Sequence, residues 1–244
     1  MNSRGTVRSI GTLFALALAA LALAELSACS NSQPQIGQVF SQVNQVWSPT
    51  AKVWQPRLSV FVLVSNADGI EDIDRLHLVH DNSRLVWSLE PSQWTRIDRT
   101  GEMWLGANNL SVPGDSGPAE IPTGAWKVLV LSKAGQQAES AFVIPPPPPG
   151  NLPPRPPVRL DLPAGWSATE RQGSFRLTGF ASDYVVWTLG ETGEVLAQKP
   201  QTSPVFSLTS LLPAATLGRV RSLMFYSYDK LAGQGLEAGP FELK

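Results

Sequence analysis

A proline-rich segment at residues 145–157 limits the possible folds of this chain more than any other feature. Nine of its thirteen residues are proline, in the order P-P-P-P-P-G-N-L-P-P-R-P-P. Proline has no backbone N–H and fixes φ, so this segment cannot lie inside a sheet and favours extended polyproline II. The sequence therefore predicts two folded units, one on each side of a stiff linker.

The two flanking segments carry similar motifs in the same order. V-W-S-L at 86–89 matches V-W-T-L at 186–189, and A-G-Q at 134–136 matches A-G-Q at 232–234. Such internal similarity indicates a duplicated module. We predict a signal peptide at 1–28, a flexible tether at 29–49, folded domains at 50–144 and 158–244, and the linker at 145–157.

Each predicted domain is rich in short apolar runs separated by turn-forming residues. In the first domain these runs are 60–64, 76–79, 85–89, 128–131 and 138–144, and they predict strands. Alternation places Leu85, Trp87 and Leu89 on one face, and the matching motif predicts the same for Val185, Trp187 and Leu189. We expect Trp87, Trp187 and Trp126 in the core. Without a convincing amphipathic helix after the signal, the sequence predicts an all-β fold of sandwiches.

Two segments resemble bacterial immunoglobulin-like modules. Residues 59–79, SVFVLVSNADGIEDIDRLHLV, resemble the B strand, turn and C strand of that family, and residues 124–144, GAWKVLVLSKAGQQAESAFVI, resemble its F–G hairpin. Trp126 stands where the family has tyrosine, while Ser132 and Gln136 depart from its usual Asp and Asn. The resemblance implies two immunoglobulin-like β-sandwiches, a fold that hosts many functions.

The N-terminus resembles that of bacterial lipoproteins. Arg4 and Arg8 precede an uncharged, Ala- and Leu-rich run at 9–24, which is typical of a secretory signal peptide helix. The lipobox motif L-[AST]-[GA]-C is then matched by Leu26, Ser27, Ala28 and Cys29. The resemblance implies cleavage before Cys29 and acylation of its thiol, which would anchor the chain to membrane lipid. We expect a lipid-anchored protein on the cell membrane or outer membrane, facing the periplasm or cell surface.

Composition excludes several function classes. The formal net charge of −1 gives no excess of basic residues for a nucleic-acid partner. A single cysteine rules out an intrachain disulfide, and with two histidines the chain holds little material for a metal centre. We therefore expect no cofactor.

Ser116 lies in P-G-D-S-G-P, which resembles the nucleophile loop G-D-S-G-G-P of chymotrypsin-like proteases. The second glycine of that motif is missing. His77, His80 and Asp98 could supply a base and its orienting acid, but neither histidine has the family's sequence context. A serine hydrolase using Ser116 is one alternative, and a polar turn between Pro113 and Pro118 is the interpretation we favour.

Two further groups of polar residues are candidate ion sites. Asn66, Asp68 and Asp72 surround Gly69 in an oxygen-rich loop that could bind calcium, although the spacing fails the EF-hand pattern. The simpler interpretation is a solvated turn between strands. His77 and His80 are three residues apart, so on a strand they face opposite sides and do not share a metal ion.

Tryptophan suggests a binding surface. Trp94 and Trp104 flank a charged, hairpin-like stretch, where exposed indoles could stack on sugars or contact a protein partner. Packing at the edge of a small sandwich is the structural alternative. The expected function is a non-catalytic interaction or structural module of the cell envelope, and the alternative is a protein that binds glycan or peptidoglycan through exposed Trp.

Overall fold

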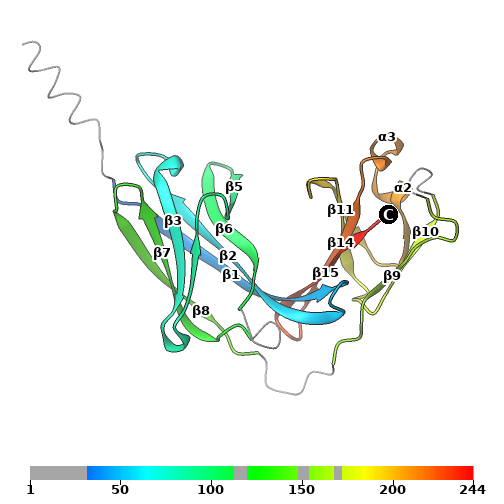
Figure 1. Cartoon of the computed structure of the whole chain (residues 1–244), viewed down its shortest axis with the longest axis horizontal. Helices are drawn as coiled ribbons and strands as arrows, with labels where there is room; N and C mark the ends of the chain where they lie inside the picture. Colours follow the sequence, from blue (N-terminus) through cyan, green and yellow to red (C-terminus); the bar gives the residue numbers. More distant parts are fainter. Residues whose placement is uncertain (1–31, 113–119, 148–153, 168–171, 244) are drawn as a thin grey trace, which may run out of the picture.

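The computed structural model describes residues 32–112, 120–147, 154–167 and 172–243. These residues form an all-β protein with two lobes that splay apart from a shared base (Figure 1). We call residues 32–147 the N-terminal lobe and residues 154–243 the C-terminal lobe. Within the described residues, no helix has the length and apolar composition needed to span a membrane.

The strands of the N-terminal lobe confirm the predicted runs, and the lobe has three further strands. The strands are β1 (Gln35–Ser48), β2 (Val53–Ser65), β3 (Ile73–His80), β4 (Leu85–Leu89), β5 (Thr95–Arg99), β6 (Glu102–Leu110), β7 (Gly124–Ser132) and β8 (Gln137–Ile144), with the short 3-10 turns η1 (Ile70–Asp72) and η2 (Asp81–Ser83). The charged stretch between Trp94 and Trp104 is the β5–β6 hairpin.

The C-terminal lobe contains shorter strands and two single-turn helices. Its elements are β9 (Arg159–Asp161), β10 (Ser174–Thr178), β11 (Tyr184–Leu189), β12 (Val195–Gln201), β13 (Val205–Ser207), α2 (Leu208–Leu211), α3 (Ala214–Leu217), β14 (Ser222–Asp229) and β15 (Gln234–Glu242). Ser207 caps α2 by accepting a hydrogen bond from the Ser210 N–H, as a serine N-cap does.

One eight-stranded sheet runs through both lobes. Its order is β12-β11-β14-β15-β1-β2-β6-β5, and the junction between the lobes is a parallel pairing of β1 with β15 at Asn44–Gly235 through Trp47–Ala238. A second sheet, β4-β3-β7-β8, covers this sheet in the N-terminal lobe, and a third, β13-β10-β9, covers it in the C-terminal lobe. The lobes are therefore joined by strand pairing, and not only by the proline-rich segment.

Each lobe encloses its own hydrophobic core between two sheets. In the N-terminal lobe Leu58, Val60 and Val62 of β2 pack against Leu76 of β3 and the fully buried Trp126 of β7. The Trp126 ring stacks on Trp87 with centroids 5.2 Å apart, and its Nε1–H donates to the Pro122 carbonyl at 2.9 Å. The expected core position of Trp126 is thus confirmed.

The core of the C-terminal lobe includes residues from the N-terminal lobe. Phe175, Val186 and Phe225 lie at its centre, and Trp47 at the end of β1 is buried among them, with 4% of its surface exposed. Trp47 contacts Trp54, its cross-strand partner in β2, at a centroid distance of 5.8 Å. The ends of β1 and β2 therefore interlock the two lobes.

The expected flexible tether at 29–49 is wrong for Gln35–Ser48, which form β1. The segment looked featureless because its core-facing apolar residues, Val39, Val43 and Trp47, recur every fourth position. A strand places positions i, i+2 and i+4 on one face. Ser41 and Gln45 occupy the intervening positions on that face, so the two-residue alternation is hidden.

The expectation that the proline-rich linker acts as a spacer between separate units also needs correction. Its described ends pack on the folded lobes: the Trp54 Nε1–H donates to the Pro156 carbonyl at 3.0 Å, and Arg155 pairs with Asp229 at 2.9 Å. Both side chains of that ion pair are about one-fifth exposed, at 22% and 21%. The pKa of Asp229 is lowered, first by the backbone N–H of Ala232 and then by Arg155.

The predicted faces of the two V-W-[ST]-L motifs have different outcomes. Leu85, Trp87 and Leu89 do share the inner face of β4. In β11, Tyr184, Val186 and Thr188 face the core. Val185, Trp187 and Leu189 share the opposite face, so the expected core position of Trp187 is wrong. The motifs occupy different places, since β4 is an edge strand and β11 is an interior strand. The facing of the residues in β4 therefore does not carry over to β11.

Candidate functional site

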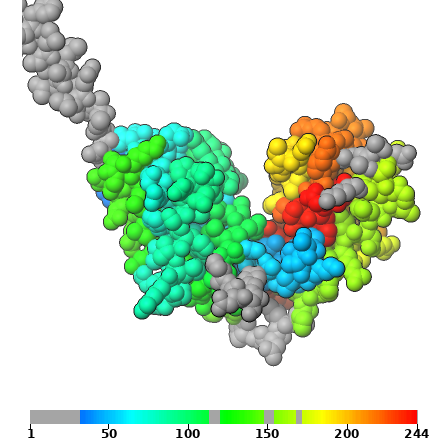
Figure 2. Space-filling model, viewed as in Figure 1, coloured from blue at the N-terminus to red at the C-terminus, as the bar shows by residue number. Residues whose placement is uncertain are grey.

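The face of the eight-stranded sheet that points away from both cores lines a cleft between the lobes (Figure 2). Core residues such as Leu105 and Phe225 alternate along their strands with residues that point into this cleft. We call this surface the sheet cleft. Its central residues are Phe40, Gln42, Asn44, Phe61, Trp104, Trp187, Tyr226 and Glu237.

A chain of hydrogen bonds forms the floor of the sheet cleft, where the lobes meet. Asn44 Nδ2 donates to Glu237 Oε1 at 2.6 Å across the β1–β15 pair. Gln42 Nε2 lies 2.8 Å from Asn44 Oδ1 and 3.2 Å from Tyr226 Oη. Asn44 and Glu237 are 4% and 8% exposed although no second sheet covers them. The floor is therefore a buried, preorganised polar cluster.

Glycine makes room for this cluster. A Cβ at Gly235 would overlap Asn44 Oδ1 and would lie 2.6 Å from Gln42 Nε2. The absence of a side chain at this position lets both amides lie flat against β15. Glycine is thus required here by close approach rather than by a turn.

Aromatic side chains form the two walls of the sheet cleft. On the N-terminal lobe, Phe61 covers Gly106, where a Cβ would meet the Phe61 ring at 2.8 Å, and Trp104 lies beside Leu63 on the same face. On the C-terminal lobe, Trp187 stacks on Tyr226 with ring centroids 6.2 Å apart and planes within 12°. These four aromatic residues belong to neither core cluster. Trp104, Trp187 and Tyr226 are partly exposed, whereas Phe61 is buried, with 8% of its surface exposed.

Burial affects the pKa of Glu237, the carboxyl group in the floor. Desolvation raises the pKa of the Glu237 carboxyl, and the hydrogen bond from Asn44 opposes that rise. Because the folded-state pKa lies above that of the unfolded chain, the native protein binds this proton more tightly. The resulting contribution to stability is complete below the unfolded pKa and is lost as the pH rises through the folded pKa.

Glu237→Gln is therefore expected to raise the melting temperature at pH 7, and the gain is expected to disappear near pH 4. The substituted amide keeps an oxygen that accepts from Asn44 and removes the cost of burying a charge. Thermal melts of both proteins between pH 4 and pH 8 measure the difference, with the exposed Glu90→Gln as the control for loss of a negative charge. A difference that stays constant with pH contradicts the prediction.

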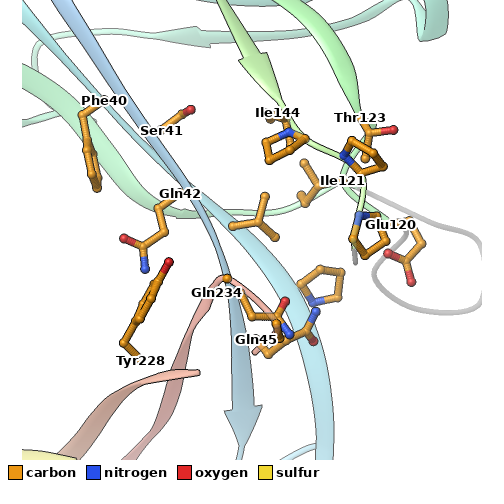
Figure 3. Close-up of a pocket in the computed structure, with 17 residues that line it drawn as sticks. Phe40, Ser41, Gln42, Gln45, Glu120, Ile121, Thr123, Ile144, Tyr228 and Gln234 are labelled. Carbon is orange, nitrogen blue, oxygen red and sulfur yellow. The ribbon is translucent and has the colours of Figure 1, made fainter. Parts of the chain in front are cut away.

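A pocket of about 300 Å³ adjoins the floor at the base of the two lobes. Figure 3 shows Phe40, Gln42 and Tyr228 on one side of β1 and Gln45 with Gln234 on the other. The pocket is completed by the start of the proline-rich segment and by the loop before β7, through Pro145, Pro146, Pro147, Glu120, Ile121 and Thr123. Gln42 lines both this pocket and the floor, so the two form one continuous surface.

The structure separates the two tryptophans that the sequence proposed as contacts. Trp94 is partly buried against the N-terminal core. Trp104 lies on the opposite face, in the wall of the sheet cleft, with its Nε1 3.4 Å from Glu102 Oε2. Trp104 is thus the one of the pair that is placed to contact a partner in the cleft.

The predicted calcium residues do lie together, in the turn between β2 and η1. Asn66 Nδ2 donates to Asp72 Oδ2 at 2.9 Å, and Ser32 donates through its backbone N–H and its hydroxyl to Asp68 Oδ2, at 2.8 and 2.7 Å. Ser32 Oγ also bonds Asn66 Oδ1. In the part of the chain that the structure describes, no cluster of three or more His, Cys, Asp or Glu side chains is arranged to hold a metal ion.

The two histidines point to opposite faces of β3, as expected. His80 is buried against the Trp126 ring, and its Nδ1 lies 2.7 Å from Ser83 Oγ. Its side chain caps η2, where it accepts from the Ser83 N–H, which is a structural role. Ser116 and the lipobox residues Leu26, Ser27, Ala28 and Cys29, with the signal peptide, lie outside the described residues.

Sequence reasoning missed the polar floor. Asn44 and Glu237 are 193 residues apart, and only the β1–β15 pairing brings them together. No local motif marks either residue.

The comparisons with known proteins leave the family open. No family model and no curated protein matches this chain. Among solved structures, it is similar to the crystal structure of dimeric latent PorU from Porphyromonas gingivalis, with 11% sequence identity and a TM-score of 0.30 over 89% of this chain. The match covers 21% of that protein, so this chain spans about a fifth of its length. Since a likeness at this level carries no argument, the residues of the sheet cleft are the basis for inferring function.

Proposed function

We propose that this chain is a lipid-anchored binding protein of the bacterial cell envelope, which holds a partner in its sheet cleft and carries out no catalysis. The sheet cleft is the observation that carries this proposal. It combines a buried polar floor at Asn44 and Glu237 with aromatic walls on both lobes. Binding sites pair apolar, aromatic surfaces with a few fixed polar groups in this way.

The strand order supports an immunoglobulin-like origin for each lobe. In the N-terminal lobe, β1-β2-β6-β5 faces β4-β3-β7-β8, which corresponds to the ABED and C′CFG sheets of immunoglobulin-like folds. In the C-terminal lobe, β13-β10-β9 and β12-β11-β14-β15 correspond to EBA and C′CFG. The duplicated A-G-Q motif falls in the equivalent β7–β8 and β14–β15 turns. This order supports two immunoglobulin-like units fused through one sheet.

The lipobox sequence supports the membrane anchor. Leu26, Ser27 and Ala28 precede the chain's one cysteine, Cys29, which is where lipoprotein processing acts. The first strand begins at Gln35, so few residues separate the lipid from the folded part. The proposed protein is held close to the cell membrane or outer membrane, on its periplasmic or surface side.

Cys29→Ser is expected to abolish fatty-acid labelling of the full-length protein and to shift it from the membrane fraction to the soluble fraction. Serine keeps the size of the side chain and removes the thiol that forms the thioether. Metabolic labelling with an alkyne fatty acid in a bacterial host measures the loss, and Ser27→Thr, which the lipobox tolerates, is the matched control. Labelling that persists in the Cys29→Ser protein would refute the anchor.

Photo-crosslinking tests the cleft as the binding surface. A photoreactive amino acid at Trp104 is expected to give a defined adduct in living cells, whereas one at the exposed Val143 of β8, on the opposite side of the lobe, is expected to give none. Adducts of equal yield at both positions would contradict a partner held in the cleft.

A further inference from the structure

We infer that the sheet cleft binds a neutral, extended glycan strand, laid across the sheet from Trp104 on one wall to Trp187 on the other. This inference rests on the proposed function and names the chemical class of its partner. It is carried by the placement of ring faces, by the hydrogen-bonding groups of the floor, and by the pairing state of the strands beneath them.

The ring faces suit pyranose sugars. Each sugar ring has an apolar C–H face that packs on an aromatic plane and an equatorial rim of hydroxyl groups. On one wall lie the stacked, near-parallel rings of Trp187 and Tyr226, and on the other lies Trp104. These three residues are partly exposed, whereas Phe61 beneath Trp104's wall is buried, with 8% of its surface exposed. Because the strands of the sheet are about 4.8 Å apart, the five steps from β6 to β11 span roughly 24 Å along the sheet. Because the sheet curves between the two lobes (Figure 1), the straight path between the walls is shorter than this, and a short oligosaccharide can span it.

The floor suits a ligand with many hydroxyl groups. Gln42 is partly exposed, and among the described residues its Oε1 accepts no hydrogen bond while its Nε2 is held by Asn44 and Tyr226. A primary amide has two donor hydrogens and two acceptor lone pairs, so Gln42 retains capacity for a hydroxyl partner. Because Asn44 and Glu237 already fix its position, little entropy is lost when a ligand binds.

The other classes of partner fit this surface less well. A peptide that adds to a sheet needs a free strand edge, and at the floor Asn44–Trp47 of β1 are paired with both β15 and β2. A phosphate or nucleic acid needs basic groups. Arg57 is opposite Asn44 in the β1–β2 pair, which places its side chain on the floor. Its guanidinium already donates to Gln55 Oε1 at 2.6 Å. A fatty-acyl chain offers no hydrogen-bond donor to Gln42 Oε1.

The test is titration calorimetry of the full-length protein in lauryldimethylamine oxide micelles, a detergent without a sugar headgroup. The probes are chitohexaose and cellohexaose, both β-1,4-linked and extended, and isomaltohexaose, which is α-1,6-linked and flexible. Binding of at least one β-1,4-linked probe is expected. Trp104→Ala and Trp187→Ala are each expected to weaken it roughly fivefold to tenfold, the range of an aromatic contact.

Val143→Ala, on an exposed face outside the sheet cleft, is the control and is expected to leave affinity unchanged. Thermal melts verify that the tryptophan variants remain folded. If the unsubstituted protein binds neither β-1,4-linked probe, or if both tryptophan variants bind as tightly as it does, the glycan inference is overturned. Equal affinity for isomaltohexaose would overturn the extended-strand assignment. Lipid labelling and the Trp104 crosslink do not depend on these calorimetry results. The proposed function can therefore be refuted or supported independently of the glycan inference.

Discussion

Trp47→Ala is expected to lower the free energy of unfolding of the C-terminal lobe by about 3–5 kcal/mol, the usual cost of removing a buried tryptophan. Trp47 belongs to β1, which pairs along its length with β2 of the N-terminal lobe. Its indole is nevertheless buried in the core of Val186, Phe225 and Ala238. The substitution would leave a cavity in a lobe that begins more than 100 residues later in the chain.

Urea denaturation followed by tryptophan fluorescence and by proteolysis of the C-terminal lobe measures this effect. Trp104→Ala is the matched control, because Trp104 lies in the wall of the sheet cleft and outside both cores. A smaller loss is expected there. If Trp47→Ala has no more effect than Trp104→Ala, the interlock of the two lobes is refuted.

Asn44→Asp is expected to destabilise the protein by about 3 kcal/mol at pH 7, since it would place two carboxyl groups side by side in a buried site. Asn44 Nδ2 now donates to Glu237 Oε1 at 2.6 Å, and both residues are less than a tenth exposed. Two carboxylates at this distance share one proton, so the loss is expected to shrink as the pH falls toward 4.

A second substitution separates this charge effect from a packing effect. The double variant Asn44→Asp/Glu237→Gln exchanges the amide and the carboxyl group, and it is expected to recover most of the lost stability at pH 7. A double-mutant cycle measured by thermal and urea denaturation gives the coupling energy. Additive effects of the two substitutions would contradict a direct contact between residues 44 and 237.

The sequence predicted the all-β class and the central strands of the N-terminal lobe because those strands carry local signals. Val60, Val128 and their neighbours form apolar runs bounded by turn-forming residues, and these runs lie in β2 and β7. Trp126 was correctly placed in the core. In these segments local propensity and tertiary position agree.

The errors came from features that no local pattern determines. β1 was taken for a tether because its core-facing apolar residues recur every fourth position. It is stabilised by pairing with the next strand, β2, and with β15, which lies far along the chain. The face of Trp187 was assigned from a motif match, but the two matched motifs lie in strands with different positions, β4 at a sheet edge and β11 in a sheet interior. Gln42, Asn44, Tyr226 and Glu237 become a cluster only through that long-range pairing.

The position of β1 determines whether the sheet cleft exists. Its pairing with β15 makes one curved sheet from two lobes, and it places Asn44 beside Glu237. Without this pairing the aromatic walls would belong to two independent domains, and neither would form a binding surface that spans the lobes. The functional proposal and the glycan inference both depend on this strand.

Amide hydrogen exchange of residues 35–48, measured by mass spectrometry on the full-length protein, tests this point most directly. A strand paired on both sides opens only with the surrounding core, so Asn44 through Trp47 are expected to be protected as strongly as the core strands β2 and β14. Rapid exchange at the rate of an unstructured chain across 35–48 would show a tether instead, and would contradict the shared sheet and the cleft that it forms.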